Sequence, residues 1–132
     1  VNFVITSDET KLGIAADMGY ASKLAFARLQ GANGLVLEAN HCPNLLMSGK
    51  YPAFLKQRIL GKFGHLSNQA MKEFLCQLLH RDLKLVVLAH ISEENNTPEL
   101  ALQNALSALS STGIPVYLAS QNSPTPVFEI AS

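Results

Sequence analysis

Two short, uninterrupted apolar runs constrain the fold of this chain more than any other feature. Leu35–Leu37 and Leu85–Ala89 contain no polar residue, which is typical of strands buried on both faces of a parallel sheet. Ser67 and Thr97 each stand where a capping side chain would begin a helix. Strands and helices that alternate in this way predict an α/β fold with one mixed sheet.

The remaining segments complete a small sheet. The other expected strands are, in chain order, residues 2–6, 11–16, 115–119 and 127–130. A helix capped by Ser22 is expected to run to about Gln30. Residues 39–64 contain several Pro and Gly residues, and we expect them to form a long connection that is functional or mobile.

The size of the chain predicts one domain that spans residues 1–132. Its 132 residues, 48% of them hydrophobic, are enough to bury one sizeable core. The expected helices cover one face of the sheet, and no expected element remains to cover the other. We therefore expect either that half of a larger fold is missing or that the chain forms an oligomer.

Charge and cysteine content narrow the classes of function. The formal net charge is zero, so binding to nucleic acid would have to rest on a local basic cluster. That cluster consists of Lys50, Lys56, Arg58 and Lys62. The two cysteines are too few for a disulfide framework, which favours a reduced, cytoplasmic protein. No apolar run approaches the roughly 20 residues of a membrane span.

Acids and histidines fall where the expected strands end. Asp17, Glu38 and His90 each follow an apolar run, and His65 lies just before the helix that Ser67 caps. A rigid sheet fixes side chains at strand ends, while the adjoining loops leave them within reach of a ligand. Two acids and two imidazoles placed in this way predict a metal-centred hydrolytic site.

Each of these residues also has a simpler structural interpretation. Asp17 suits a strand-to-helix turn, His90 suits a core histidine bonded to the backbone, and His65 suits a helix entry. Glu38 has no Lys or Arg beside it in sequence, and a carboxylate there needs solvent, a metal or a hydrogen-bond donor. His41 either pairs with Glu38 or lies in a solvent-facing loop.

Taken together, these segments resemble the C-terminal half of the metallo-β-lactamase fold, in the WalJ/YycJ-like branch of its metallo-hydrolases. The resembling stretches keep the family's order and span residues 14–20, 35–41, 58–61, 64–68 and 88–97. The resemblance implies half of a four-layer αββα sandwich, classed as α/β or by some schemes as α+β. That half consists of one mixed sheet with helices on one face.

The resemblance also implies a role for each site residue. Asp17 matches an aspartate that bridges two metal ions, Zn or Mn, and His90 matches the last metal-binding histidine. Glu38 and His65 are similar to an acid and a histidine that related phosphodiesterases place beside the scissile phosphate. There the histidine helps to protonate the leaving group and the acid orients it. His41 is a further candidate, and the basic cluster is expected to contact the nucleic-acid backbone.

The main metal motif of the family, His-x-His-x-Asp-His, is absent from this sequence. The resemblance assigns it to the N-terminal half, and Asp17 with His90 cannot satisfy two ions. We therefore expect a fragment of a binuclear metal-dependent hydrolase, a phosphodiesterase or nuclease. Alone it should be inactive, and it should need the N-terminal half or a second copy. The alternatives are a hydrolase of small esters, thioesters or lactams, and a non-catalytic α/β module that dimerises through its uncovered sheet face.

Overall fold

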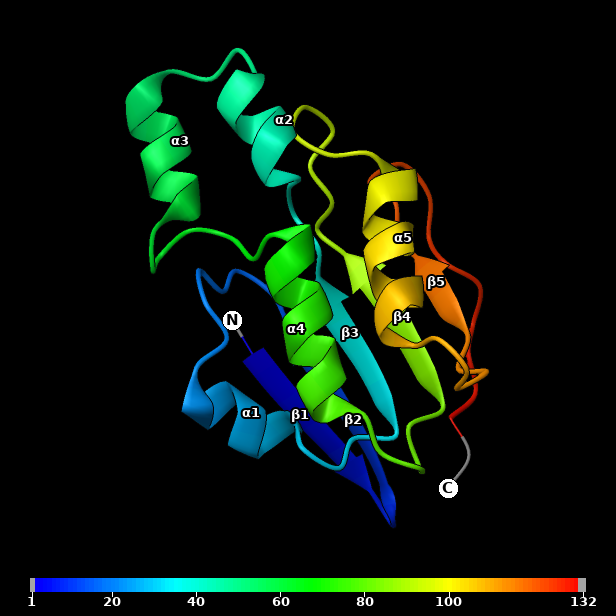
Figure 1. Cartoon of the computed structure of the whole chain (residues 1–132). Coiled ribbons are helices and arrows are strands. Elements are labelled where there is room, and N and C mark those ends of the chain that lie inside the picture. Colours follow the sequence, from blue (N-terminus) through cyan, green and yellow to red (C-terminus); the bar gives the residue numbers. More distant parts are fainter. Residues whose placement is uncertain (1, 131–132) are drawn as a thin grey trace.

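The computed structural model describes residues 2–130, which form a five-stranded mixed sheet with helices (Figure 1). The strand order β1-β2-β3-β4-β5 follows the chain. β1 pairs antiparallel with β2, and the other three pairings are parallel. The strands are β1 (Asn2–Ser7), β2 (Thr10–Ala15), β3 (Gly34–Glu38), β4 (Leu85–Ala89) and β5 (Val116–Leu118). The expected fold class is confirmed.

Within residues 2–130, five helices connect the strands. They are α1 (Lys23–Leu29), α2 (Pro43–Ser48), α3 (Ala53–Leu60), α4 (Asn68–Leu78) and α5 (Pro98–Ala108). The three expected caps form, because Ser22, Ser67 and Thr97 each accept a hydrogen bond from a first-turn backbone N–H. None of these helices has the length and apolarity that crossing a membrane requires.

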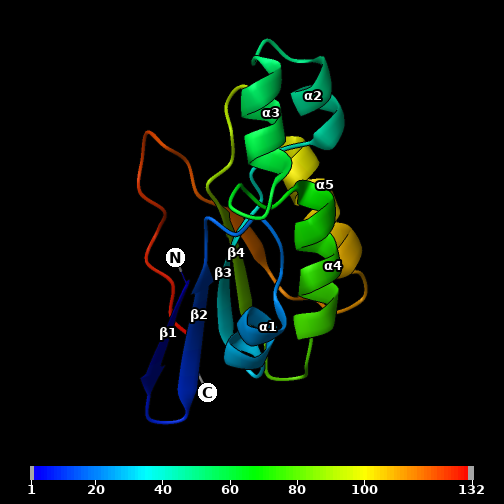
Figure 2. The same cartoon turned by 90° about the vertical axis from the view of Figure 1, so that its left-hand side faces the viewer.

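The core lies between one face of the sheet and three helices. Figure 2 shows α1, α4 and α5 on the same side of the sheet, as right-handed parallel crossovers require. Leu37 and Leu88 project from the sheet toward this side, where Met71 and Phe74 of α4 meet them. All four side chains are essentially inaccessible to solvent, so the sheet edge that carries the site stands on a rigid base.

Residues 2–130 place no helix on the opposite face of the sheet, and several apolar side chains there stay exposed. Phe3 is 56% exposed and Ile5 54%, and their register against β2 puts them on the face away from the helices. Tyr117, which pairs with Val87, lies on the same face and is 41% exposed. Helices on only one face were expected, and that expectation is confirmed.

The expected last strand, residues 127–130, does not form. These residues are described, but they have no strand partner. They lie across the uncovered face instead (Figure 2). There the Phe128 ring packs 4.3 Å from that of Tyr117, and Ile130 lies against Gly34. The apolar residues that suggested a strand are used for packing across the sheet rather than for pairing with its edge.

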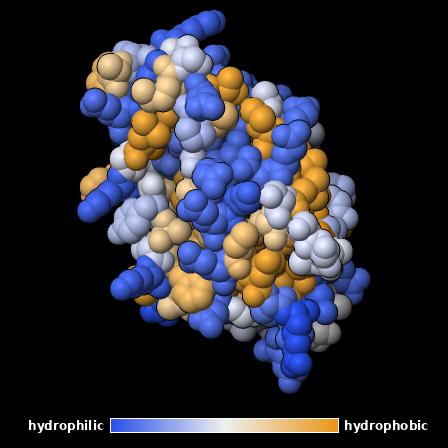
Figure 3. All heavy atoms as spheres, viewed as in Figure 1, coloured by the Kyte–Doolittle hydropathy of each residue, from blue (hydrophilic) through white to orange (hydrophobic). Residues whose placement is uncertain are grey.

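The long connection after β3 is more ordered than expected. Residues 43–64, which we call the arm, contain α2 and α3 and project beyond the carboxyl ends of the parallel strands (Figures 1 and 2). Pro43 lies in the first turn of α2 and Pro52 is the N-cap of α3, so both prolines begin helices. Apolar and hydrophilic side chains alternate over the arm in Figure 3, and Phe54 is 73% exposed.

Candidate metal centre

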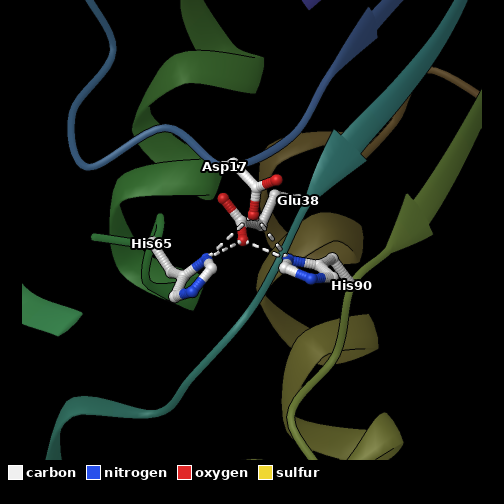
Figure 4. Close-up of side chains that lie close together, drawn as sticks. All are labelled: Asp17, Glu38, His65 and His90. Atoms are coloured by element: carbon white, nitrogen blue, oxygen red, sulfur yellow. Dashed lines mark hydrogen bonds and ion pairs between the residues drawn. The ribbon is translucent and has the colours of Figure 1, made fainter. Parts of the chain in front are cut away.

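The parallel register brings four predicted site residues together. Glu38 pairs with Ala89, the last residue of β4. His90 is the next residue in the chain and therefore lies close to Glu38. Asp17 follows β2 at the same edge, and His65 enters from the loop that precedes α4. One ligand atom from each of Asp17, Glu38, His65 and His90 lies within 4.8 Å of the others (Figure 4).

Glu38 is the hub of this group. Its side chain is 0% exposed. Oε1 accepts hydrogen bonds from Nδ1 of His65 at 2.7 Å and from Nδ1 of His90 at 2.6 Å. Oε2 accepts from the backbone N–H groups of Met18 at 3.2 Å and Leu66 at 3.1 Å. Four donors therefore satisfy a buried carboxylate that would otherwise be costly to remove from water.

These contacts fix which ring nitrogens are free. An ionised carboxylate can only accept hydrogen bonds, so Nδ1 of both His65 and His90 must carry a proton. In a ring that carries a single proton, Nε2 then keeps its lone pair, which is what a metal ligand needs. A carboxylate behind a histidine is the usual support for a metal-binding imidazole.

Asp17 completes the group from the more open side. Its Oδ1 lies 3.4 Å from Nδ1 of His65 and 3.5 Å from Nδ1 of His90, and its side chain is 55% exposed. Asp17 and His90 both have left-handed backbones, with φ of 55° and 56°. Such conformations are uncommon for non-glycine residues and gather at functional sites. They direct both side chains across the end of the sheet.

The donor set suits a divalent transition-metal ion. Carboxylate oxygen and neutral imidazole nitrogen are the ligands that zinc and manganese take in proteins. The group contains an exposed carboxylate and two imidazoles with Nε2 unused by Glu38. It also borders a hollow of about 320 Å³, the inner hollow, which Asn40, Ser92 and Glu93 help to line. An ion and a small substrate group can both reach it.

His41 is not part of this group. It is only 1% exposed, and its Nδ1 contacts Oδ1 of Asn40 at 3.3 Å. Its Nε2 has no hydrogen-bond partner among the described residues. Neither expected environment, a pair with Glu38 or a solvent-facing loop, is found. Burial lowers the pKa of His41 from its usual 6.5, although the Glu38 charge partly opposes this effect.

The buried His41 predicts a pH-dependent stability. Because its folded pKa lies below 6.5, the unfolded chain binds more protons as the pH falls through 6.5 toward the folded value. The free energy of unfolding should therefore be highest above pH 6.5 with respect to this group, and it should decline as the pH falls below 6.5. Denaturant unfolding of the wild type and of His41→Gln between pH 5 and 8 tests this. The variant should show a shallower decline, and equal slopes would contradict the prediction.

Asparagines that the sequence analysis did not single out tie the site loops together. Asn40 donates from Nδ2 to the backbone carbonyl of His90 at 2.9 Å. Asn68 and Asn96 exchange two amide hydrogen bonds, at 2.8 and 2.9 Å. Asn95 and Asn96 are buried shortly after His90, and Asn95 lines the inner hollow. These two asparagines follow β4 and the site residue His90 closely in the sequence, and that position was the signal that could have identified them.

The basic cluster lies on the arm, and its members differ in environment. Lys50, Arg58 and Lys62 are exposed, whereas Lys56 is partly buried and donates to the carbonyl of Met47 at 2.7 Å. Arg58 lines a second hollow, of about 470 Å³, together with Asp17 and His65. We call this the arm hollow. The arm hollow lies between the arm and the metal centre, because residues of both line it.

Gly64 holds the arm close to the site. A Cβ added there would lie 2.0 Å from the carbonyl oxygen of Ile59, so a side chain cannot fit without moving the backbone. Gly64→Ala should therefore lower the free energy of unfolding by about 1–3 kcal/mol, as measured by denaturant titration. Gly61→Ala is the matched control, since its nearest contact would be 3.3 Å. Equal losses in the two variants would contradict this account.

The amino-acid sequence of the chain is similar to those of two known nucleases. No protein-family model matches the chain. The exodeoxyribonuclease WalJ of Streptococcus pneumoniae serotype 2 is 36% identical over 129 residues, which are 93% of this chain and 48% of that protein. The exodeoxyribonuclease YycJ of Bacillus anthracis is 32% identical over 86% of this chain and 43% of that protein.

A solved structure gives the fold independently. The metallo-β-lactamase fold protein YhfI of Bacillus subtilis superposes with a TM-score of 0.60 at 15% identity, covering 89% of this chain and 40% of that one. The chain thus spans about half the length of the curated relatives it matches. The chain is therefore a homologue of part of the WalJ and YycJ exodeoxyribonucleases, and it has the fold of the corresponding part of a metallo-β-lactamase fold protein.

Proposed function

We propose that this chain is the C-terminal half of a two-metal phosphodiesterase that acts on DNA. The observation that carries the proposal is the Glu38 carboxylate, which holds Nδ1 of both His65 and His90 and leaves both Nε2 atoms available. The relatives at 36% and 32% identity are named exodeoxyribonucleases, which supports DNA as the substrate.

Each site residue then has a distinct task. Asp17 and His90 would hold the metal ions. His65, once protonated on Nε2 as well as on Nδ1, would donate the Nε2 proton to the leaving oxygen of the phosphodiester. Glu38 would orient both rings without touching the substrate. When bound, a pair of divalent ions lowers the pKa of a water and stabilises both the attacking and the leaving oxygen.

The uncovered sheet face supports a partner half. Phe3, Ile5 and Tyr117 expose apolar surface there, and sheets bury such a face by packing against a second sheet. The relatives are about twice as long as this chain, so they have the length for a second half. We propose that the N-terminal half covers this face and brings the remaining metal ligands.

Reconstitution tests the proposal. The chain is mixed with a purified N-terminal half and Zn²⁺ or Mn²⁺, and the release of nucleotides from DNA is measured. Hydrolysis is expected from the mixture, and neither half alone should produce it. His65→Ala should reduce the rate by roughly 10²–10⁴-fold, the usual share of a general acid, without preventing assembly of the two halves.

The same mixture separates the alternatives. Hydrolysis of a small ester, thioester or lactam without any DNA cleavage would favour a small-molecule hydrolase on this fold. A stable dimer of the chain that neither binds the N-terminal half nor hydrolyses any of these substrates would favour a non-catalytic module. Either result would overturn the proposed phosphodiesterase.

A further inference from the structure

Phe63 is the most exposed aromatic residue of the arm and stands beside the metal centre. Its side chain is 97% exposed. It lines the arm hollow together with Asp17 and His65. At about 470 Å³, this hollow falls within the roughly 300–1,000 Å³ of small-ligand sites. An uncovered aromatic face is therefore available next to the groups that would perform the chemistry.

The backbone that carries Phe63 is held firmly. Gly64 donates to the carbonyl of Gly61 at 3.0 Å, and His65 donates to the carbonyl of Ile59 at 3.0 Å. From the other side, a Cβ on Gly19 would come within 2.2 Å of the Lys62 carbonyl, so the loop that carries Asp17 abuts this turn. The backbone that carries the ring is thus held next to both site loops, which lowers the entropy cost of binding a ligand there.

The charge around Phe63 is suited to an anion. Residues 43–64 contain four of the chain's ten Lys and Arg residues and no Asp or Glu. One of the four, Arg58, lines the arm hollow with Phe63. The inner hollow instead has Glu93 and Glu94 in its wall, and both are exposed. A polyanion that reaches the metal centre is therefore attracted along the arm and repelled from the β4–α5 loop.

An aromatic ring beside a cation is a recurring site for single-stranded nucleic acid. Bases stack on the ring whatever their identity, while Lys and Arg contact the phosphates. A base inside a duplex has no free face, so such a ring selects an unpaired nucleotide. We propose that Phe63 stacks on an unpaired base next to the scissile phosphate of a DNA strand, while Arg58 contacts the neighbouring phosphate. This inference rests on the proposed function and names the form of DNA that the site takes.

The chain contains no tryptophan, so Phe63→Trp introduces a single fluorescent reporter. The 132-residue chain carrying this substitution is titrated without metal at low salt, first with single-stranded oligothymidylate. The second titration uses an abasic oligonucleotide of the same length. Phe54→Trp is the matched control, because Phe54 is 73% exposed on the same arm but does not line the arm hollow.

Stacking predicts that oligothymidylate quenches the Phe63→Trp fluorescence strongly and that the abasic strand quenches it weakly. Phe54→Trp should respond weakly to both strands. In anisotropy measurements with labelled oligothymidylate, Phe63→Ala should weaken binding roughly five- to 150-fold, the range for loss of one base–aromatic stack. Arg58→Gln should reduce the dependence of affinity on salt.

Three results would overturn the inference: no binding of either strand, equal quenching in the two tryptophan variants, or equal quenching by the two strands. Because the titration needs neither metal nor hydrolysis, it is independent of the reconstitution experiment. A chain that binds oligothymidylate through Phe63 but shows no hydrolysis with its N-terminal half would contradict the proposed function only. Hydrolysis of DNA without stacking at Phe63 would contradict this inference only.

Discussion

Replacing Glu38 with glutamine should destabilise the chain by about 2–5 kcal/mol, because two buried donors lose their acceptor. The amide nitrogen must face either the two histidine Nδ1 atoms or the backbone N–H groups of Met18 and Leu66. The first choice forces both rings to move their proton from Nδ1 to Nε2, and the second leaves two buried backbone N–H groups without an acceptor. Denaturant unfolding of the chain measures the loss. Glu73→Gln is the control, since this exposed carboxylate has a helical partner in Gln69 and should change stability by less than about 0.5 kcal/mol.

The same substitution should disturb both imidazoles. With the carboxylate in place, proton–nitrogen NMR of the side chains should show Nδ1–H on His65 and on His90. Glu38→Gln should remove that preference. In the assembled protein it should weaken metal binding about 10–100-fold, the usual effect of removing the group behind a metal-binding histidine. Unchanged stability together with unchanged histidine spectra would contradict the role of Glu38 as the hub.

Replacing Asp17 with asparagine should have the opposite profile, with little effect on stability and a large one on activity. Asn tolerates the left-handed backbone that Asp17 adopts, and the side chain is more than half exposed, so the fold should persist. The loss of a charged ligand should lower DNA hydrolysis by the assembled protein by roughly 10³-fold or more. Nucleotide release and the thermal midpoint of the chain are the two measurements.

A matched control for Asp17→Asn exists in the same chain. Asp8 has a φ of 51° and is exposed in the β1–β2 turn, away from the metal centre. Asp8→Asn therefore makes the same chemical change on the same type of backbone and should leave hydrolysis unchanged. Full hydrolysis by Asp17→Asn would contradict its place among the metal ligands. An equal loss in both variants would point to a general effect of charge instead.

The sequence predicted the main features of the site because they depend on local pattern. Continuous apolar runs predict parallel strands, and parallel strands end at one edge of a sheet. Asp17, Glu38 and His90 could therefore be placed together before their contacts were known. His65 was placed from its position just before the capping Ser67.

Other features depend on tertiary packing, and no local pattern contains them. Residues 39–64 were expected to form a long connection that is functional or mobile, and no local pattern indicated that Pro43 and Pro52 begin helices there. Residues 127–130 have the composition of a strand but pack through Phe128 and Ile130. His41 was placed beside Glu38 or in solvent, whereas the fold buries it beside Asn40.

Counting metal ions tests the central claim most directly. The chain is assembled with its N-terminal half, supplied with Zn²⁺ or Mn²⁺ and weighed by native mass spectrometry, alongside assemblies that carry Asp17→Asn or His90→Ala. Two ions per assembly are predicted for the wild type, and fewer than two for each variant, with assembly itself unchanged. Two ions held equally by all three assemblies, or by the N-terminal half alone, would contradict a metal centre that this chain helps to build.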